Sequence, residues 1–234
     1  MKALITAAGL GTRLGNLTQN TNKCLLEIGG KPLLRHTVDM LKKLGISDIY
    51  IVVGHCAGLI EKEFEGEVTF LHNRQYSSTS LLSSVVLGKD HLVGSDFIVM
   101  TGDSLMHPKI MGSFLEEPGQ VLASVELKAC DEEDFKAIIK NDKIVAMSKE
   151  IPLHQASGEF TAMVRVPKEA SMAFFEETEK FIQDGGTKKY IADIVMFLQN
   201  RNFEVRPVYT NGLPRIEIDF PQDLERAREI YKQF

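Results

Sequence analysis

Two glycines and two basic residues near the N-terminus are the first candidates for chemistry in this sequence. Gly9 and Gly11 follow an apolar run over residues 4–8, and Arg13 and Lys23 come soon after. Glycine lets backbone N–H groups approach an anion closely, and the two cationic side chains supply charge for it. This stretch therefore predicts a loop that binds a phosphate-bearing ligand.

Carboxylates in two distant parts of the chain are the second candidates. Asp103 follows the apolar run 97–100, so it would lie at the carboxyl end of a buried strand, where open α/β sheets bind ligands. Asp103 is equally compatible with capping a turn. Glu217 and Asp219 alternate with isoleucines, so a strand would turn both carboxylates to one face, within reach of one cation. Taken alone, a solvated face on an edge strand is the simpler interpretation.

The elements that must position these residues alternate between strand and helix in the first half of the chain. Continuous apolar runs suit strands buried on both faces, and Pro32 opens a helix that Gly45 ends. Strands are expected at residues 4–8, 49–53, 68–71 and 97–100, and helices at 32–44, 58–64 and 79–92. This alternation predicts an α/β fold with a Rossmann-like, open, mostly parallel mixed sheet flanked by helices.

The pattern becomes more antiparallel after about residue 118. Asn141-Asp142 is typical of a hairpin turn between two strands. Strands are expected at 121–127, 135–140, 143–147, 158–166, 203–209 and 215–218, and helices at 168–183, 188–200 and 222–232. No internal repeat or linker interrupts the chain, so we interpret residues 1–234 as one domain with parts 1–118 and 119–234.

Composition excludes several classes of protein. The 234 residues have a net charge of −5 with scattered cations, which argues against a nucleic-acid binder. The three cysteines form no CxxC motif, which favours reduced thiols in a cytoplasmic protein. The apolar run after Met1 is too short for a membrane span and atypical of a secretory signal. The sequence does not determine the oligomeric state, and a homodimer is compatible with it.

Two common phosphate-binding loops do not fit the N-terminal stretch. A Walker A loop needs Gly-Lys followed by Ser or Thr, and here Gly30-Lys31 precedes Pro32. A dinucleotide fingerprint needs a third glycine and an immediate helix. Leu14 occupies the glycine position, and Lys23 comes before the first helix begins.

A third type of loop fits. Residues 7–13 (AAGLGTR), 22–25 (NKCL) and 29–33 (GGKPL) resemble the nucleotidyltransferase family of nucleotide-sugar pyrophosphorylases, whose pattern is roughly LAAGxGxRL…PKxL…GKPLL. Thr6 replaces the usual leucine. Asn22 replaces the usual proline, and this exchange is expected to loosen the loop.

Two further stretches resemble the cytidylyltransferase branch of that family. Residues 73–84 are similar to the NxxYxxTNNxxSL pattern of phosphocholine and phosphonate cytidylyltransferases, with Ser80 and Leu81 in place of the two asparagines. Residues 217–224 (EIDFPQDL) look like the closing motif of that branch. The resemblance extends from residue 4 to residue 224 and is sparse between 105 and 145.

The resemblance implies a fold of the nucleotide-diphospho-sugar transferase type, with residues 1–118 binding the nucleotide and 119–234 the acceptor. It implies transfer of CMP from CTP to 2-aminoethylphosphonate, phosphocholine or a similar small ester, with release of pyrophosphate. Arg13 and Lys23 would be the catalytic residues. Mg²⁺ would be held by Asp103, Glu217 and Asp219, because carboxylate oxygens suit this ion. Nucleotide contacts would come from Ala7, Ala8, Gly9, Leu10, Gly11, Thr12, Arg13, Lys23, Thr79, Ser84 and Asp103.

The acceptor residues and the competing functions follow from the same resemblance. Lys149 is a candidate partner for the phosphonate and Glu159 for an ammonium group, although each is equally compatible with an exposed ion pair of no function. One alternative is a sugar-1-phosphate nucleotidyltransferase that forms a UDP- or dTDP-sugar. Another, of a different class, is a non-catalytic nucleotide-binding regulatory module.

Overall fold

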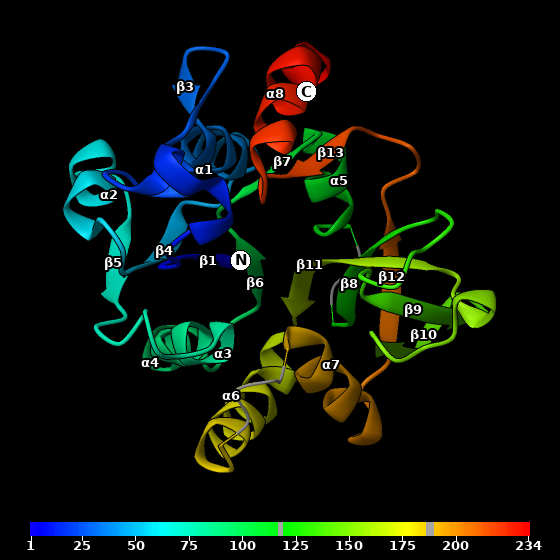
Figure 1. The fold of residues 1–234 in the computed structure, drawn as a ribbon. Helices are drawn as coiled ribbons and strands as arrows, with labels where there is room; N and C mark the ends of the chain where they lie inside the picture. Colours follow the sequence, from blue (N-terminus) through cyan, green and yellow to red (C-terminus); the bar gives the residue numbers. More distant parts are fainter. Residues whose placement is uncertain (117–118, 186–189) are drawn as a thin grey trace.

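The computed structural model describes residues 1–116, 119–185 and 190–234. A mixed sheet of nine strands runs through them in the order β10-β9-β11-β6-β1-β4-β5, with β8 beside β11 and β12 beside β8 (Figure 1). Its strands are β1 (Lys2–Ala7), β4 (Asp48–Val53), β5 (Thr69–His72), β6 (Phe97–Thr101), β8 (Val121–Glu126), β9 (Lys136–Lys140), β10 (Lys143–Ser148), β11 (Gly158–Val166) and β12 (Val205–Tyr209).

Strand β1 lies at the centre of the parallel half. It pairs in parallel with β4 on one side and with β6 on the other, so that Leu4 lies between Tyr50 and Val99. Apolar residues on both faces of β1 are buried, which explains its unbroken hydrophobic run. Because β1 and β6 point the same way, the glycine loop after Ala7 and the segment that ends at Asp103 leave the sheet at the same edge.

Helices cover both faces of this sheet (Figure 1), and each face has its own apolar core. One core includes residues of α1, α2 and α5, and the other includes residues of α3, α4, α6 and α7. The helices are α1 (Leu33–Lys43), α2 (Ala57–Glu63), α3 (Leu81–Val85), α4 (Lys89–Leu92), α5 (Pro108–Ser113), α6 (Lys168–Gln183), α7 (Ile191–Asn200) and α8 (Pro221–Ile230). The predicted α/β architecture is confirmed.

The later strands are more antiparallel, as predicted. Strand β11 runs antiparallel to β6, β8 and β9, and β9 and β10 form a hairpin. Asn141 and Asp142 at its turn have φ values of 50° and 58°, the left-handed pair that a tight two-residue hairpin turn requires. Strand β11 contains an irregularity between Phe160 and Val164, where its register with β8 shifts.

Two small ribbons were not predicted as pairs, although the strand expected at 215–218 is one of the four strands that form them. Strand β2 (Glu27–Ile28) pairs with β3 (Lys31–Pro32), and β7 (Ser104–Met106) pairs with β13 (Arg215–Glu217). The second ribbon places Glu217 opposite Ser104, immediately after Asp103. The other three strands have only two or three residues, too few for a detectable periodicity, so the sequence does not indicate them.

Other segments differ from the prediction in detail. The helix expected over 79–92 is divided into α3, a 3₁₀ turn η3 (Val86–Gly88) and α4. The final helix ends at Ile230, and a 3₁₀ turn η5 (Tyr231–Gln233) follows. Helix α7 begins at Ile191, and the expected start at 188 lies outside the described residues. Among the described residues, no helix combines the length and apolar character needed to span a bilayer.

Candidate active site

The glycine loop is closely packed. Gly11 adopts φ of 64°, and a Cβ on it would lie 3.3 Å from Lys23 Cβ and Thr18 Cγ2. The Thr18 hydroxyl donates to the carbonyl of Gly11 at 2.9 Å. The expected polar loop over residues 9–24 contains two 3₁₀ segments, η1 (Thr12–Thr18) and η2 (Lys23–Leu25). A side chain at position 11 would therefore disturb both the backbone and the packing of Lys23.

Asn22 does not loosen this loop, so the expectation drawn from its exchange with proline is wrong. The side chain is fully buried. Its Nδ2 donates to the carbonyls of Ala7 (2.9 Å) and His55 (3.0 Å), and its Oδ1 accepts from the N–H of Cys24 (2.9 Å). One amide thus joins the end of β1, the segment after β4 and the start of η2. Proline could make none of these three hydrogen bonds.

Lys23 lies at the centre of the charged groups. Its Nζ is 2.5 Å from Asp103 Oδ2 and 3.1 Å from Asp219 Oδ1, and the side chain is 15% exposed. Arg13 Nη1 is 2.9 Å from Asp219 Oδ2 and is much more exposed. Burial alone would lower the pKa of Lys23, but the charges of Asp103 and Asp219 outweigh burial and raise that pKa above its usual range. Lys23 is therefore a fixed positive charge.

The three predicted carboxylates come together. Asp103, Glu217 and Asp219 each offer an oxygen, and these oxygens all lie within 4.8 Å of one another. Desolvation, and then the charge of Asp103, raise the pKa of Glu217 to about 7 against the opposing effect of Arg215. Asp103 Oδ1 is buried and has no hydrogen-bond partner among the described residues. An unpartnered buried oxygen in a set of hard oxygen donors fits a divalent cation such as Mg²⁺.

A cavity of about 230 Å³ opens beside this cluster. Its walls come from the glycine loop, from the ends of β1 and β6, and from the segment between β5 and α3. The predicted residues among its lining are Ala7, Ala8, Gly9, Gly11, Lys23, Thr79, Ser84 and Asp103. Leu10 is exposed and is not part of this lining, whereas Thr12 and Arg13 border an adjoining hollow with Lys23 and Asp219.

Asn73 organises the wall that contains Thr79 and Ser84. Its Nδ2 donates to the hydroxyls of Thr79 (3.1 Å) and Ser84 (3.0 Å), and its Oδ1 accepts from the N–H of Gln75. The sequence singled out residues 73–84 as a motif but gave Asn73 no role. The hydrogen bonds show that it holds the two hydroxyls in place at the cavity.

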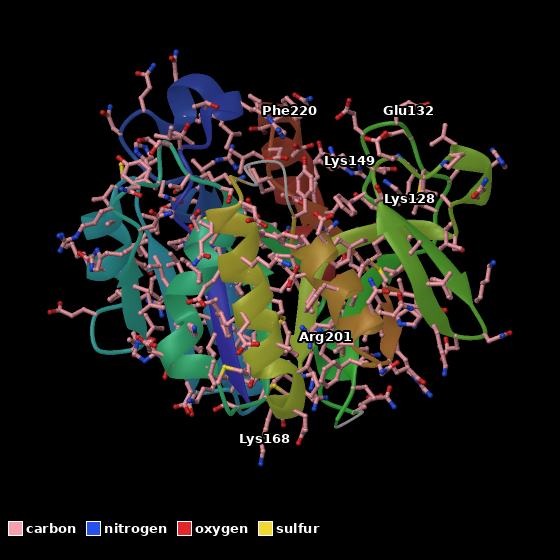
Figure 2. The ribbon with its side chains drawn as sticks, turned by 90° about the horizontal axis from the view of Figure 1, so that it is seen from below. Lys128, Glu132, Lys149, Lys168, Arg201 and Phe220 are labelled. Atoms are coloured by element: carbon pink, nitrogen blue, oxygen red, sulfur yellow. The ribbon has the colours of Figure 1, made fainter. Side chains whose placement is uncertain are left out.

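The two predicted acceptor residues lie elsewhere. Glu159 pairs with Lys128 at 2.9 Å, and Lys149 lies 3.8 Å from the exposed Glu133. Neither borders the cavity beside Lys23. In Figure 2, Lys149 and Lys128 lie in the same half of the molecule as Phe220, the residue after Asp219, and opposite to Lys168. Burial would lower the pKa of Lys128, but Glu159 and Asp134 together outweigh it and raise that pKa to about 12.

The sequence of residues 3–192 matches the MobA-like NTP transferase domain. The chain belongs to this family. Relatives of this MobA-like NTP transferase include UTP–glucose-1-phosphate uridylyltransferase from Haloferax volcanii, 33% identical over 115 residues, which are 47% of the chain and 46% of the relative. Choline-phosphate cytidylyltransferase from Streptococcus pneumoniae is 41% identical over 97 residues, 41% of the chain and 42% of the relative.

A third relative of the MobA-like NTP transferase is CMP-5'-(3-aminopropyl)phosphonate synthase from Streptomyces rubellomurinus, 30% identical over 50% of the chain and 19% of the relative. The chain thus spans less than half the length of the curated relatives it matches. The inositol-1-phosphate CTP transferase from T. maritima has a similar fold, with a TM-score of 0.82 and 20% identity over 99% of the chain and 95% of that structure. The nucleotide-diphospho-sugar transferase type of fold is confirmed.

Proposed function

We propose that this nucleotidyltransferase is a cytidylyltransferase that transfers CMP from CTP to a small phosphate or phosphonate ester and releases pyrophosphate. The observation that supports it most directly is the convergence of Lys23 with Asp103, Glu217 and Asp219 beside the glycine-lined cavity. Cytosine as the base, and 2-aminoethylphosphonate or a phosphocholine-like ester as the acceptor, are supported by two of the relatives.

The chemistry needs little beyond positioning and charge. A phosphate or phosphonate oxygen has a second pKa of about 6, so it is largely ionised near neutral pH and attacks the α-phosphorus without a general base. The barrier is the approach of two anions and the charge that develops on the leaving pyrophosphate. Lys23 and Arg13 would bind the triphosphate and offset that charge, and the N–H groups of residues 9–12 would bind its oxygens.

The carboxylates would hold Mg²⁺, which supplies positive charge to the phosphate oxygens when it is bound. Lys23 and Arg13 pair with Asp103 and Asp219 in the structure. A triphosphate would compete for both cations, because its charge exceeds that of a single carboxylate. Asp103 and Asp219 would then be available to the metal ion as the nucleotide enters.

A sugar-1-phosphate nucleotidyltransferase is the second candidate, because the uridylyltransferase from Haloferax volcanii matches a similar share of the chain. Purified protein with Mg²⁺ is incubated with CTP, UTP, dTTP or GTP and with a panel of phosphate esters, phosphonates and hexose 1-phosphates, and pyrophosphate release is measured. We expect turnover with CTP and an amino-alkyl phosphonate or choline phosphate. Turnover only with UTP or dTTP and a hexose 1-phosphate would overturn the proposal in favour of the second candidate.

Single substitutions test the roles of the charged residues. Lys23→Ala and Asp103→Asn should each lower kcat by about 10²-fold or more, because each removes a group that stabilises charge. Lys31→Ala is the matched control, since Lys31 pairs with Asp39 at 3.0 Å outside the site. If the site variants kept turnover within a few-fold of the wild type, the assigned roles would be wrong. If the wild type released no pyrophosphate with any pair yet bound nucleotide, it would be a regulatory module.

A further inference from the structure

Arg215 connects the carboxylate cluster to the antiparallel half of the sheet. This residue begins β13, and its side chain is only 9% exposed. Its Nη2 is 3.1 Å from Glu217 Oε2 and 3.3 Å from the carbonyl oxygen of Thr161 in β11. A single guanidinium nitrogen therefore donates both to a candidate metal carboxylate and to the backbone of another strand.

The carbonyl of Thr161 can accept a hydrogen bond from Arg215 because β11 is distorted at this point. The pairing of β11 with β8 shifts between Phe160 and Val164, and Ala162 within this bulge has φ of 57°. A left-handed conformation is unfavourable for a residue with a side chain, so it persists only where the surroundings hold it. Bulges of this kind free a backbone group from the ladder and re-aim it.

Ser124 on β8 holds the bulge in place. Its side chain is fully buried, and its Oγ accepts from the Thr161 hydroxyl at 2.5 Å and from the N–H of Met163 at 3.3 Å. The distortion is therefore fixed on both sides of Ala162. The position of the Thr161 carbonyl, and through it that of Arg215, is set by the sheet.

The cations of the cluster fall into two kinds. Lys23 and Arg13 contact Asp103 and Asp219, and the proposed function has the triphosphate draw them away. Arg215 contacts Glu217, and its second contact is with the protein backbone. Its charge therefore stays beside Glu217 while the other two move.

We propose that Arg215 is a positioning residue that fixes the Glu217 carboxylate beside Asp103 and Asp219 and thereby raises the affinity of the cluster for a divalent cation. The inference rests on the proposed function only in assuming that a nucleotide-dependent metal ion binds there. Groups that orient metal-binding side chains typically contribute about 10–100-fold to metal affinity.

The chain offers a matched control for the Arg215–Glu217 pair. Arg206 pairs with Glu204, again two residues apart, with Nε 2.6 Å from Oε1. Arg206 lies on β12, and neither residue of this pair belongs to the carboxylate cluster. Arg206→Gln therefore removes a similar charge and a similar ion pair without touching the proposed site.

Mn²⁺ binding measured by electron paramagnetic resonance tests the inference without the acceptor. The full chain is titrated with Mn²⁺ in the presence of each of CTP, UTP, dTTP and GTP, and the background of the nucleotide alone is subtracted. With whichever nucleotide the wild type uses, Arg215→Gln should weaken Mn²⁺ binding by about 10-fold or more, and Arg206→Gln should leave it unchanged. Turnover of Arg215→Gln should recover as Mn²⁺ is raised, which a merely structural defect would not do.

The thermal unfolding midpoint shows whether Arg215→Gln folds. If it does not fold, Arg215→Lys is the second variant that tests the inference. Lysine keeps the charge but lacks the planar guanidinium, so binding should be weaker than in the wild type and tighter than in Arg215→Gln. A folded Arg215→Gln or Arg215→Lys with wild-type Mn²⁺ affinity would overturn the inference and leave the proposed function standing. A wild type that binds no Mn²⁺ with any of the four nucleotides would overturn both.

Discussion

Asn22 shows what a single exchange within a motif can do. The family pattern that the sequence resembles has a proline at this position, and this protein has an amide that joins three segments through hydrogen bonds. Both solutions fix the loop in front of Lys23, one through the backbone dihedral angle and the other through buried contacts. The sequence could not reveal this, because the partners of the amide are main-chain groups brought close only by the fold.

We predict that Asn22→Ala destabilises the protein by about 1–3 kcal/mol, because it leaves two carbonyls and one N–H of the loop without their partner in a buried site. Asn16→Ala is the control, since Asn16 makes an exposed hydrogen bond to Gln19. Urea unfolding of both variants measures the difference. Equal midpoints for Asn22→Ala and the wild type would show that water replaces the amide without cost.

At the scale of elements, the long strands and helices follow from the sequence, whereas of the four strands in the two short ribbons only β13 does. The apolar runs of β1, β4 and β6 and the proline–glycine boundaries of α1 predict those elements closely. The β7–β13 ribbon exists only because residues far apart in the chain meet. The convergence of Asp103 with Glu217 was expected from the family resemblance. The contact of Arg215 with the β11 backbone was not expected, because it depends on a bulge that no local sequence pattern predicts.

The β2–β3 hairpin packs against the C-terminal segment (residues 231–234) at Gly29. A Cβ on Gly29 would lie 2.2 Å from the ring of Tyr231, whereas nothing lies within 4 Å of the corresponding position on Gly30. Both glycines have positive φ, 59° and 79°. Substitution at either position strains the backbone, but only substitution at Gly29 also displaces the aromatic ring.

We therefore predict that Gly30→Ala lowers the free energy of unfolding by about 1 kcal/mol, the cost of a left-handed alanine, and that Gly29→Ala lowers it further. Limited proteolysis should cut the C-terminal segment faster in Gly29→Ala than in Gly30→Ala. Identical unfolding midpoints and cleavage rates would mean that Tyr231 moves aside freely and does not hold the segment.

At the scale of the whole molecule, one sheet spans both the N-terminal and the C-terminal parts of the chain. Strand β11 pairs with β6 of the parallel half and with β8 and β9 of the antiparallel half. The sequence predicts the change from parallel to antiparallel strands near residue 118. It does not indicate which strand joins the two halves, because β-pairing partners are chosen by the tertiary fold.

Because the halves share a sheet, we predict that they unfold together, as one domain over residues 1–234 would. Far-ultraviolet circular dichroism and tyrosine fluorescence should give the same midpoint in a guanidinium titration. Tyr50 lies on β4 and Tyr209 on β12, so the fluorescence samples both halves. Two separated transitions would instead assign residues 1–118 and 119–234 to independent units.

The ion pair between Lys23 and Asp219 joins residues 196 positions apart in the chain. During synthesis the glycine loop and Asp103 emerge from the ribosome long before Glu217 and Asp219, and closing so long a loop is slow because its entropy must be lost before any contact is gained. We therefore expect the charged centre to form after the local strands and helices of residues 1–116. A chain interrupted before Arg215 would contain every strand of the nine-stranded sheet and still lack the carboxylates of Glu217 and Asp219.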